Sequence, residues 1–123
     1  NPHCVVFCED PAALDLEAIG PKFEYAKYFP ERINTEFVRI VNDETLRMRV
    51  WERGSGETMA CGTGATASAA AAIFTGAVNG KRTVIVELDG GILEFTKEEN
   101  GMFWMKGPAE FVFEAEMEGV REK

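Results

Sequence analysis

A cysteine followed by small residues marks the part of the chain best suited to chemistry. Cys61 precedes Gly62 and Thr63, and the segment from Cys61 to Gly80 has no charged side chain and consists mostly of Ala, Thr, Ser and Gly. A thiol where a loop enters a helix meets unpaired N–H groups and the positive end of the helix dipole, which favour the thiolate. The same N–H groups hold carboxylates and phosphates. The pattern predicts a reactive thiol beside an anion-binding helix end, and a buried structural cysteine is the alternative.

Three charged or titratable residues are further candidates. Glu52 and Arg53 follow a predicted strand, where a loop can present them, although they could equally form an exposed ion pair of little energetic value. His3 is the only histidine and stands beside Pro2 at the start of a short apolar run. A single histidine is weak evidence for catalysis when taken alone.

Periodicity and turn residues predict the elements that position these candidates. The apolar run from Val5 to Phe7 predicts a buried strand, and Asp10, Pro11 and Gly20 bracket a helix over Ala12–Ile19. Phe37–Val41 and Leu46–Trp51 flank a hairpin turn, and in the second strand apolar residues alternate with arginines, so we expect one buried and one wet face. Four more strands are expected at Thr83–Leu88, Ile92–Thr96, Met102–Lys106 and Glu110–Met117.

The short, glycine-containing turns between these last four strands require a largely antiparallel arrangement. A helix of small residues that is apolar all round must be covered on all sides. We therefore expect an α+β fold over a single domain, residues 1–123, in which a strongly curved, barrel-like, largely antiparallel sheet wraps around one central helix. Trp51, Trp104 and the phenylalanines are expected in the core.

Composition narrows the function classes. The net charge of −8 and the absence of a Lys/Arg cluster disfavour nucleic acid as a partner. We expect a cytoplasmic protein because the sequence shows no leader and no strongly apolar spanning run, and a piece of a longer protein because it does not begin with Met. Cys4, Cys8 and Cys61 have no paired metal spacing, so neither a disulfide framework nor a metal site is predicted, and Cys4 and Cys8 are expected to be buried strand residues.

The glycines after Cys61 also fit a nucleotide-binding pattern. Residues Gly62–Ala67 satisfy G-x-G-x-x-A, and Glu87 lies where an acidic ribose ligand would be expected. The pattern requires a strand running straight into the first glycine, whereas a charged loop separates Trp51 from Gly62 here. A non-catalytic anion- or nucleotide-binding module is therefore the alternative to an enzyme.

Three sequence blocks resemble one enzyme family. The segment Glu52–Ala65, ERGSGETMACGTGA, is similar to the second-cysteine motif of the diaminopimelate epimerases. Asn1-Pro2-His3, with Val-Val-Phe shortly after it, resembles the N-P-H strand of that family, and Phe29–Phe37 resembles its F-P segment leading into N-x-E-F. The blocks occur in the family's order, and the resemblance extends over essentially the whole chain.

The resemblance implies a fold, a partner and a mechanism. These enzymes are cofactor-independent isomerases made of two similar halves, each a sheet around a central helix, and this chain resembles only the C-terminal half. The N-terminal half would be its partner, and Cys61 would be one of two thiols acting on opposite faces of the substrate α-carbon. His3 and Glu52 would position or help protonate the thiols.

The resemblance also assigns ligand contacts to particular residues. Asn1 and Asn34 would bind the distal end or the α-amino group of an amino-acid substrate. Glu52 and Arg53 would bind its polar head groups, and the Arg53 fork suits a carboxylate. Gly62 and Thr63 would hold the reacting α-carboxylate at the helix end.

The complete enzyme, of which this chain would be half, is expected to interconvert LL- and meso-diaminopimelate, in lysine and peptidoglycan precursor synthesis. A racemase of another amino acid with the same two-thiol plan, such as histidine or proline, is the alternative substrate assignment. Without its other half the chain is expected to be inactive, and its exposed cleft face is expected to drive self-association.

Overall fold

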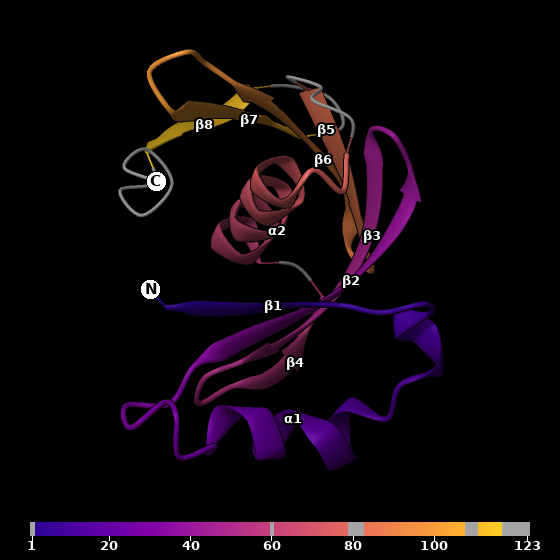
Figure 1. Ribbon diagram of the computed structural model, residues 1–123, viewed down its shortest axis with the longest axis vertical. Helices are drawn as coiled ribbons and strands as arrows, with labels where there is room; N and C mark the ends of the chain where they lie inside the picture. Colours follow the sequence, from indigo (N-terminus) through magenta and orange to yellow (C-terminus); the bar gives the residue numbers. More distant parts are fainter. Residues whose placement is uncertain (1, 60, 79–82, 108–110, 117–123) are drawn as a thin grey trace.

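The computed structural model of the chain describes residues 2–59, 61–78, 83–107 and, as backbone, 111–116 (Figure 1). Asn1, Gly80, Glu110 and Met117, on which some of the expectations depend, lie outside these residues. The strands are β1 (His3–Phe7), β2 (Asn34–Asn42), β3 (Thr45–Glu52), β4 (Gly56–Thr58), β5 (Thr83–Leu88), β6 (Gly91–Lys97), β7 (Met102–Lys106) and β8 (Phe111–Glu116). The helices are a 3₁₀ turn η1 (Pro11–Ala13), α1 (Leu16–Glu24) and α2 (Gly62–Thr75).

The strands form one mixed sheet in the order β1-β2-β3-β5-β6-β7-β8, with β4 paired to β3. The β2–β3 hairpin and the run from β5 to β8 are antiparallel, as predicted from their short turns. The pairs β1–β2 and β3–β5 are parallel. Parallel neighbours need a long crossover, which η1 with α1 and then α2 provide, so the two helices account for the parallel pairs.

The sheet bends around α2, with β1 to β3 on one side of the helix and β5 to β8 on the other (Figure 1). The helix contributes buried small side chains, so the strands can approach its backbone closely. Within the described part of the chain the sheet does not close, because β1 and β8 lie at opposite ends of the strand order. The fold is thus α+β as expected, whereas the expected barrel-like enclosure is not established.

α1 covers the other face of β1 to β3, where Leu16, Phe37 and Trp51 form a second small core. The predicted helix over Ala12–Ile19 is wrong in its bounds. Asp10 caps only the 3₁₀ turn, and Asp15 caps α1, which runs through Gly20. Gly20 does not end the helix; it allows contact with Trp51, whose Cδ2 would lie 2.2 Å from an added Cβ.

The arginine face of β3 is covered, contrary to the expectation of a wet face. The Arg49 side chain is only 16% exposed, and it forms a two-pronged ion pair with Glu57. Its Nη1 also donates to the carbonyl oxygens of Pro11 and Leu14, at 2.7 and 2.8 Å. The segment before α1 therefore folds over this face of the sheet, which the local alternation could not indicate.

Two further expectations about burial need correction. Trp51 is buried, but Trp104 on β7 is 37% exposed, because it points to the face of the sheet away from the core. Among the phenylalanines, Phe37, Phe95 and Phe103 are buried, whereas Phe7 and Phe74 are exposed. Cys4 and Cys8 are half-buried.

None of the described helices is both long and apolar enough to cross a membrane.

Candidate active site

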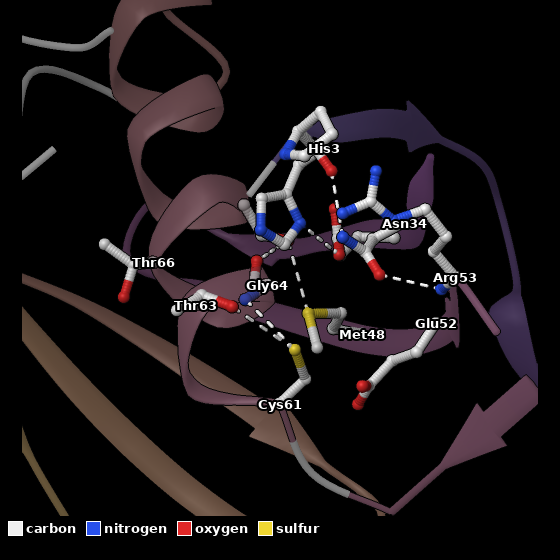
Figure 2. A network of polar contacts seen from close by, with 12 residues as sticks. His3, Asn34, Met48, Glu52, Arg53, Cys61, Thr63, Gly64 and Thr66 are labelled. Atoms are coloured by element: carbon white, nitrogen blue, oxygen red, sulfur yellow. Dashed lines mark hydrogen bonds and ion pairs between the residues drawn. The ribbon is translucent and has the colours of Figure 1, made fainter. Parts of the chain in front are cut away.

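Most of the predicted site residues meet at one edge of the sheet, beside the N-terminus of α2 (Figure 2). His3 begins β1 and pairs in register with Asn34, which begins the parallel strand β2. Glu52 ends the antiparallel strand β3, so it lies at the same edge. Cys61 caps α2, which enters the curved sheet there.

Cys61 is the N-cap residue of α2, as the sequence indicated. Its backbone is extended, and its Sγ accepts a hydrogen bond from the Gly64 N–H at 3.3 Å. The Thr63 hydroxyl lies 3.6 Å from the same sulfur. The first turn of the helix therefore holds the thiol in place, because a backbone N–H of that turn donates a hydrogen bond to the sulfur.

The pKa of Cys61 is nevertheless raised, contrary to the expected low value. Burial is the largest cause, and the nearby carboxyl groups, Glu52 more than Glu36, add to it. The hydrogen bonds from Thr63 and Gly64 oppose the rise without overcoming it. The resting side chain is therefore the protonated thiol, because removal from water and the nearby carboxyl groups outweigh the favourable helix end.

Glu52 and Arg53 have separate partners and do not depend on each other. The Glu52 Oε2 accepts from the Thr58 hydroxyl at 2.5 Å, and its carboxylate points toward Cys61 in Figure 2. Arg53 Nη1 donates to the Glu31 carbonyl at 3.0 Å. The two charged side chains thus extend from the end of β3 to different parts of the site, rather than forming an isolated surface pair.

Asn34 connects three segments of the site edge. Its Nδ2 donates to the Pro2 carbonyl at 3.0 Å, and its Oδ1 accepts from the Arg53 backbone N–H at 2.8 Å. The amide therefore holds the start of β1 and the residue after β3 in place. Its expected contact with a substrate stays a prediction, and the same prediction for Asn1 falls outside the described residues.

Gly62 and Thr63 form the first turn of α2, where a carboxylate would meet free N–H groups. Thr63 is exposed, and a Cβ on Gly62 would lie 3.4 Å from the Met105 methyl group. The strand before this helix, β4, is a short edge strand antiparallel to β3. A dinucleotide fingerprint requires a parallel strand that leads directly into the first glycine, so the fold does not support the nucleotide reading of Gly62–Ala67.

Glu36 belongs to this site and was missed by the sequence reasoning. Its Oε2 lies 2.8 Å from His3 Nδ1, and the two side chains are 0% and 5% exposed. A Cβ on Gly64 would lie 2.6 Å from the same Oε2 and 3.2 Å from the Cys61 sulfur. The available signal was a carboxylate inside the apolar strand Asn34–Asn42, within the N-x-E-F block.

A second buried carboxylate supports the loop that carries Arg53. Glu24, at the end of α1, accepts from the Trp51 indole N–H and from the Gly54 N–H, both at 2.9 Å. Arg32 Nη1 lies 3.2 Å from Glu24 Oε2, the same oxygen that accepts from Gly54. In the part of the chain that the structure describes, no three His, Cys, Asp or Glu side chains gather in a way that could hold a metal ion.

Solved structures contain the same fold. The chain aligns with a phenazine biosynthesis protein of the PhzF family from Bacillus anthracis at a TM-score of 0.57 and 26% identity, over 84% of this chain and 33% of that one. A PhzF family protein from Enterococcus faecalis aligns at a TM-score of 0.59 and 19% identity, over 82% and 35%. The chain is thus an α+β domain of the kind found as part of these larger proteins.

Sequence comparison defines the family more narrowly. Residues 1–112 match the family model described as diaminopimelate epimerase, and the chain belongs to that family. It is 55% identical to the diaminopimelate epimerase of Nostoc punctiforme and 52% identical to that of Synechococcus elongatus, covering 92% and 96% of this chain. It is 53% identical to the enzyme of Phocaeicola vulgatus over 96% of this chain. The chain spans about two fifths of the length of these relatives, 40%, 41% and 42% respectively.

Proposed function

We propose that this chain is the C-terminal half of an epimerase that interconverts LL- and meso-diaminopimelate without a cofactor, in lysine and peptidoglycan precursor synthesis. The observation that carries the proposal is the position of Cys61 at the N-terminus of α2, with Glu52 and His3 at the same edge of the sheet, in a member of this family. The second half of the site would come from the N-terminal domain.

The chemistry is a proton exchange at the substrate α-carbon. A base on one face removes the α-proton and leaves a carbanion, and an acid on the opposite face delivers a proton to the same carbon. The raised pKa of Cys61 keeps the thiol protonated, which suits the acid in one direction. In the reverse direction the thiolate of Cys61 takes the proton, and a thiol of the N-terminal half supplies one.

The remaining site residues bind and orient the substrate in this scheme. The N–H groups of Gly62 and Thr63 hold the α-carboxylate, where they stabilise the negative charge that develops during proton removal. Arg53 binds a carboxylate through its guanidinium, and Asn34 and Asn1 bind the distal end or the α-amino group. His3 and Glu52 help position and protonate the two thiols.

The N-terminal half is proposed to cover the side of the domain on which Cys61 and Thr63 lie. Each half would keep its own curved, barrel-like sheet around its own central helix, with the site in the cleft between the halves. A domain separated from its partner would expose that face and associate with itself. We place the complete enzyme in the cytoplasm, where diaminopimelate is made.

Deuterium exchange at the α-carbon of diaminopimelate tests the proposal. The chain joined to a family N-terminal half should incorporate one deuterium at the inverted centre in D₂O. Cys61→Ser should reduce exchange by at least about a thousandfold, because a hydroxyl is a far weaker acid and base than a thiol at neutral pH. Cys8→Ser, outside the site, should retain the wild-type rate.

Three outcomes would overturn the proposal. Full exchange by residues 1–123 alone would show that a second thiol is not needed. Faster turnover of histidine or proline than of diaminopimelate would assign the chain to a different racemase. Wild-type activity of Cys61→Ser would show that the thiol has only a structural role.

A further inference from the structure

The His3–Glu36 pair contains more polar atoms than the protein satisfies. Both side chains are almost fully removed from water, and one contact joins them, Nδ1 to Oε2 at 2.8 Å. Among the described residues, His3 Nε2 and Glu36 Oε1 are buried without any hydrogen-bond partner. A buried group without a partner is costly, and the cost is much larger for a group that carries a full charge.

This cost determines where the protons of the pair lie. A carboxylate beside an imidazole that has a proton only on Nδ1 would leave a net negative charge in the interior, with Oε1 unpaired. One additional proton removes that net charge, so the pair then holds two protons. One lies between Oε2 and Nδ1, on either atom, and the other is on the second ring nitrogen, Nε2, in both arrangements.

The surroundings favour the same arrangement. Burial is the largest cause of a raised pKa of Glu36, and the charge of Glu52 adds to the rise, whereas the hydrogen bond and charge of His3 and a hydrogen bond from the Glu36 backbone oppose it. A second negative group at this edge, Glu52, makes a further uncompensated charge on Glu36 less favourable. Gly64 packs directly on Oε2, so no water has room on that side of the carboxyl.

We propose that Glu36 is a positioning residue for His3, and that it holds the imidazole in the form in which Nε2 carries a proton. The contact on Nδ1 fixes the ring, and Nε2 is then available as a donor to the acceptor that the complete site brings. The ring's partner, Glu36 Oε2, also faces Gly64 in the first turn of α2, so the contact on Nδ1 fixes the ring near the start of that helix (Figure 2). This role rests on the proposed epimerase function, in which His3 assists proton transfer.

The primary test is the proton state of the ring, measured by ¹⁵N NMR of the histidine in residues 1–123. Because His3 is the only histidine, its two ring nitrogens give unambiguous signals. The wild-type chain should show a protonated Nε2 at neutral pH. A ring with a bare Nε2 and a proton on Nδ1 alone would overturn the proposal without any variant.

Two variants separate positioning from packing. Glu36→Gln keeps the size and can donate an amide N–H to Nδ1, so Nε2 should stay protonated. Glu36→Leu cannot donate, and the ring should change to a mixture of both forms. Glu24→Gln, which alters another buried carboxylate with partners elsewhere, should leave the ring signals unchanged. An unchanged ring in Glu36→Leu would contradict the proposal.

A kinetic measurement follows in the enzyme that contains this chain. Glu36→Leu should lower kcat for α-proton exchange by about 10- to 100-fold, the range seen when the hydrogen-bond partner that orients a metal-binding histidine is removed. KM should change by less than about twofold, because Glu36 does not contact the substrate, and Glu36→Gln should recover much of kcat. An unchanged kcat in Glu36→Leu would leave Glu36 a packing residue only. If the wild-type enzyme does not act on diaminopimelate, the proposed function fails, while the NMR result still decides the proton state of His3.

Discussion

At the scale of single residues, the site combines a helix end that favours negative charge with surroundings that oppose it. Cys61 accepts a hydrogen bond from the first turn of α2, yet burial and the nearby Glu52 carboxylate raise its pKa. The protonated thiol can act as the acid. To act as the base it must first lose its proton, and the nearby carboxylate charge makes this loss less favourable. The residues that tune this thiol, Glu52 and Thr63, should therefore act in opposite directions.

We expect Glu52→Gln to lower the pKa of Cys61. Replacing the carboxylate removes a negative charge that disfavours the thiolate, so more thiolate forms at a given pH. The pH dependence of iodoacetamide alkylation, followed by mass spectrometry of the Cys61 peptide, should shift its midpoint to lower pH. Thr63→Val, which removes a hydrogen bond that lowers the pKa, should shift the midpoint to higher pH. A shift of both variants in one direction would contradict this account.

Gly64→Ala should destabilise the protein, although alanine is the better helix former. The added Cβ would lie 2.6 Å from Glu36 Oε2 and 3.2 Å from the Cys61 sulfur, so buried groups must move. Overpacking of this kind costs about 1–3 kcal/mol. Urea unfolding should show the loss as a lower midpoint with an unchanged slope.

Gly62→Ala is the matched control in the same helical turn. Its added Cβ would meet the end of the flexible Met105 side chain, with the methyl at 3.4 Å and the sulfur at 3.7 Å. The unfolding midpoint should stay close to that of the wild type. Equal losses in the two variants would show that the helix end, rather than contact with Glu36, sets the cost.

At the scale of elements, α1 packs on the outer face of β1 to β3, and one close contact with the sheet holds it there. Gly20 lies against the Trp51 ring, and Glu24 on the next turn accepts from the Trp51 indole N–H. The same carboxylate accepts from Gly54, which follows the residue proposed to bind a carboxylate, Arg53. The helix therefore supports the loop of the site from the side opposite α2.

Gly20→Ala should separate α1 from the sheet. The Trp51 Cδ2 would lie 2.2 Å from the new Cβ, and the buried indole cannot move aside without losing its contacts. A loss of at least about 1–3 kcal/mol in unfolding free energy is expected. Lys22→Ala, at an exposed position of the same helix, should change stability by less than about 0.5 kcal/mol. A near-neutral Gly20→Ala would show that the contact with Trp51 is loose.

At the scale of the whole molecule, two cores share the strands β2 and β3. Val38 and Met48 face α2, whereas Phe37 and Trp51 belong to the core under α1. Neither layer can be removed without exposing one face of the same strands. The domain should therefore unfold as one unit.

Tryptophan fluorescence tests this cooperativity. In Trp104→Phe the only indole is Trp51, which reports on the core under α1, and far-UV circular dichroism reports on the whole fold. Both probes should give the same urea midpoint. An earlier fluorescence transition would show that α1 separates from the sheet before the rest of the domain unfolds.

The sequence by itself determined much of this architecture, because local patterns encode it. Alternation and tight turns located the β2–β3 hairpin and the run from β5 to β8, and small uncharged residues identified α2 as the buried helix. The motif around Cys61 placed the thiol at a helix start, and the three sequence blocks identified the family, which the family model confirms. These features depend on neighbours within a few residues or on motifs read directly from the chain.

The tertiary structure decided what depends on distant partners. The parallel pairings of β1 with β2 and of β3 with β5, the cover over Arg49, and the passage of α1 through Gly20 all follow from contacts far apart in the sequence. The raised pKa of Cys61 and the Glu36 partner of His3 have the same origin. Burial and charge proximity are properties of the assembled fold, so the motif could place the thiol but could not give its proton affinity.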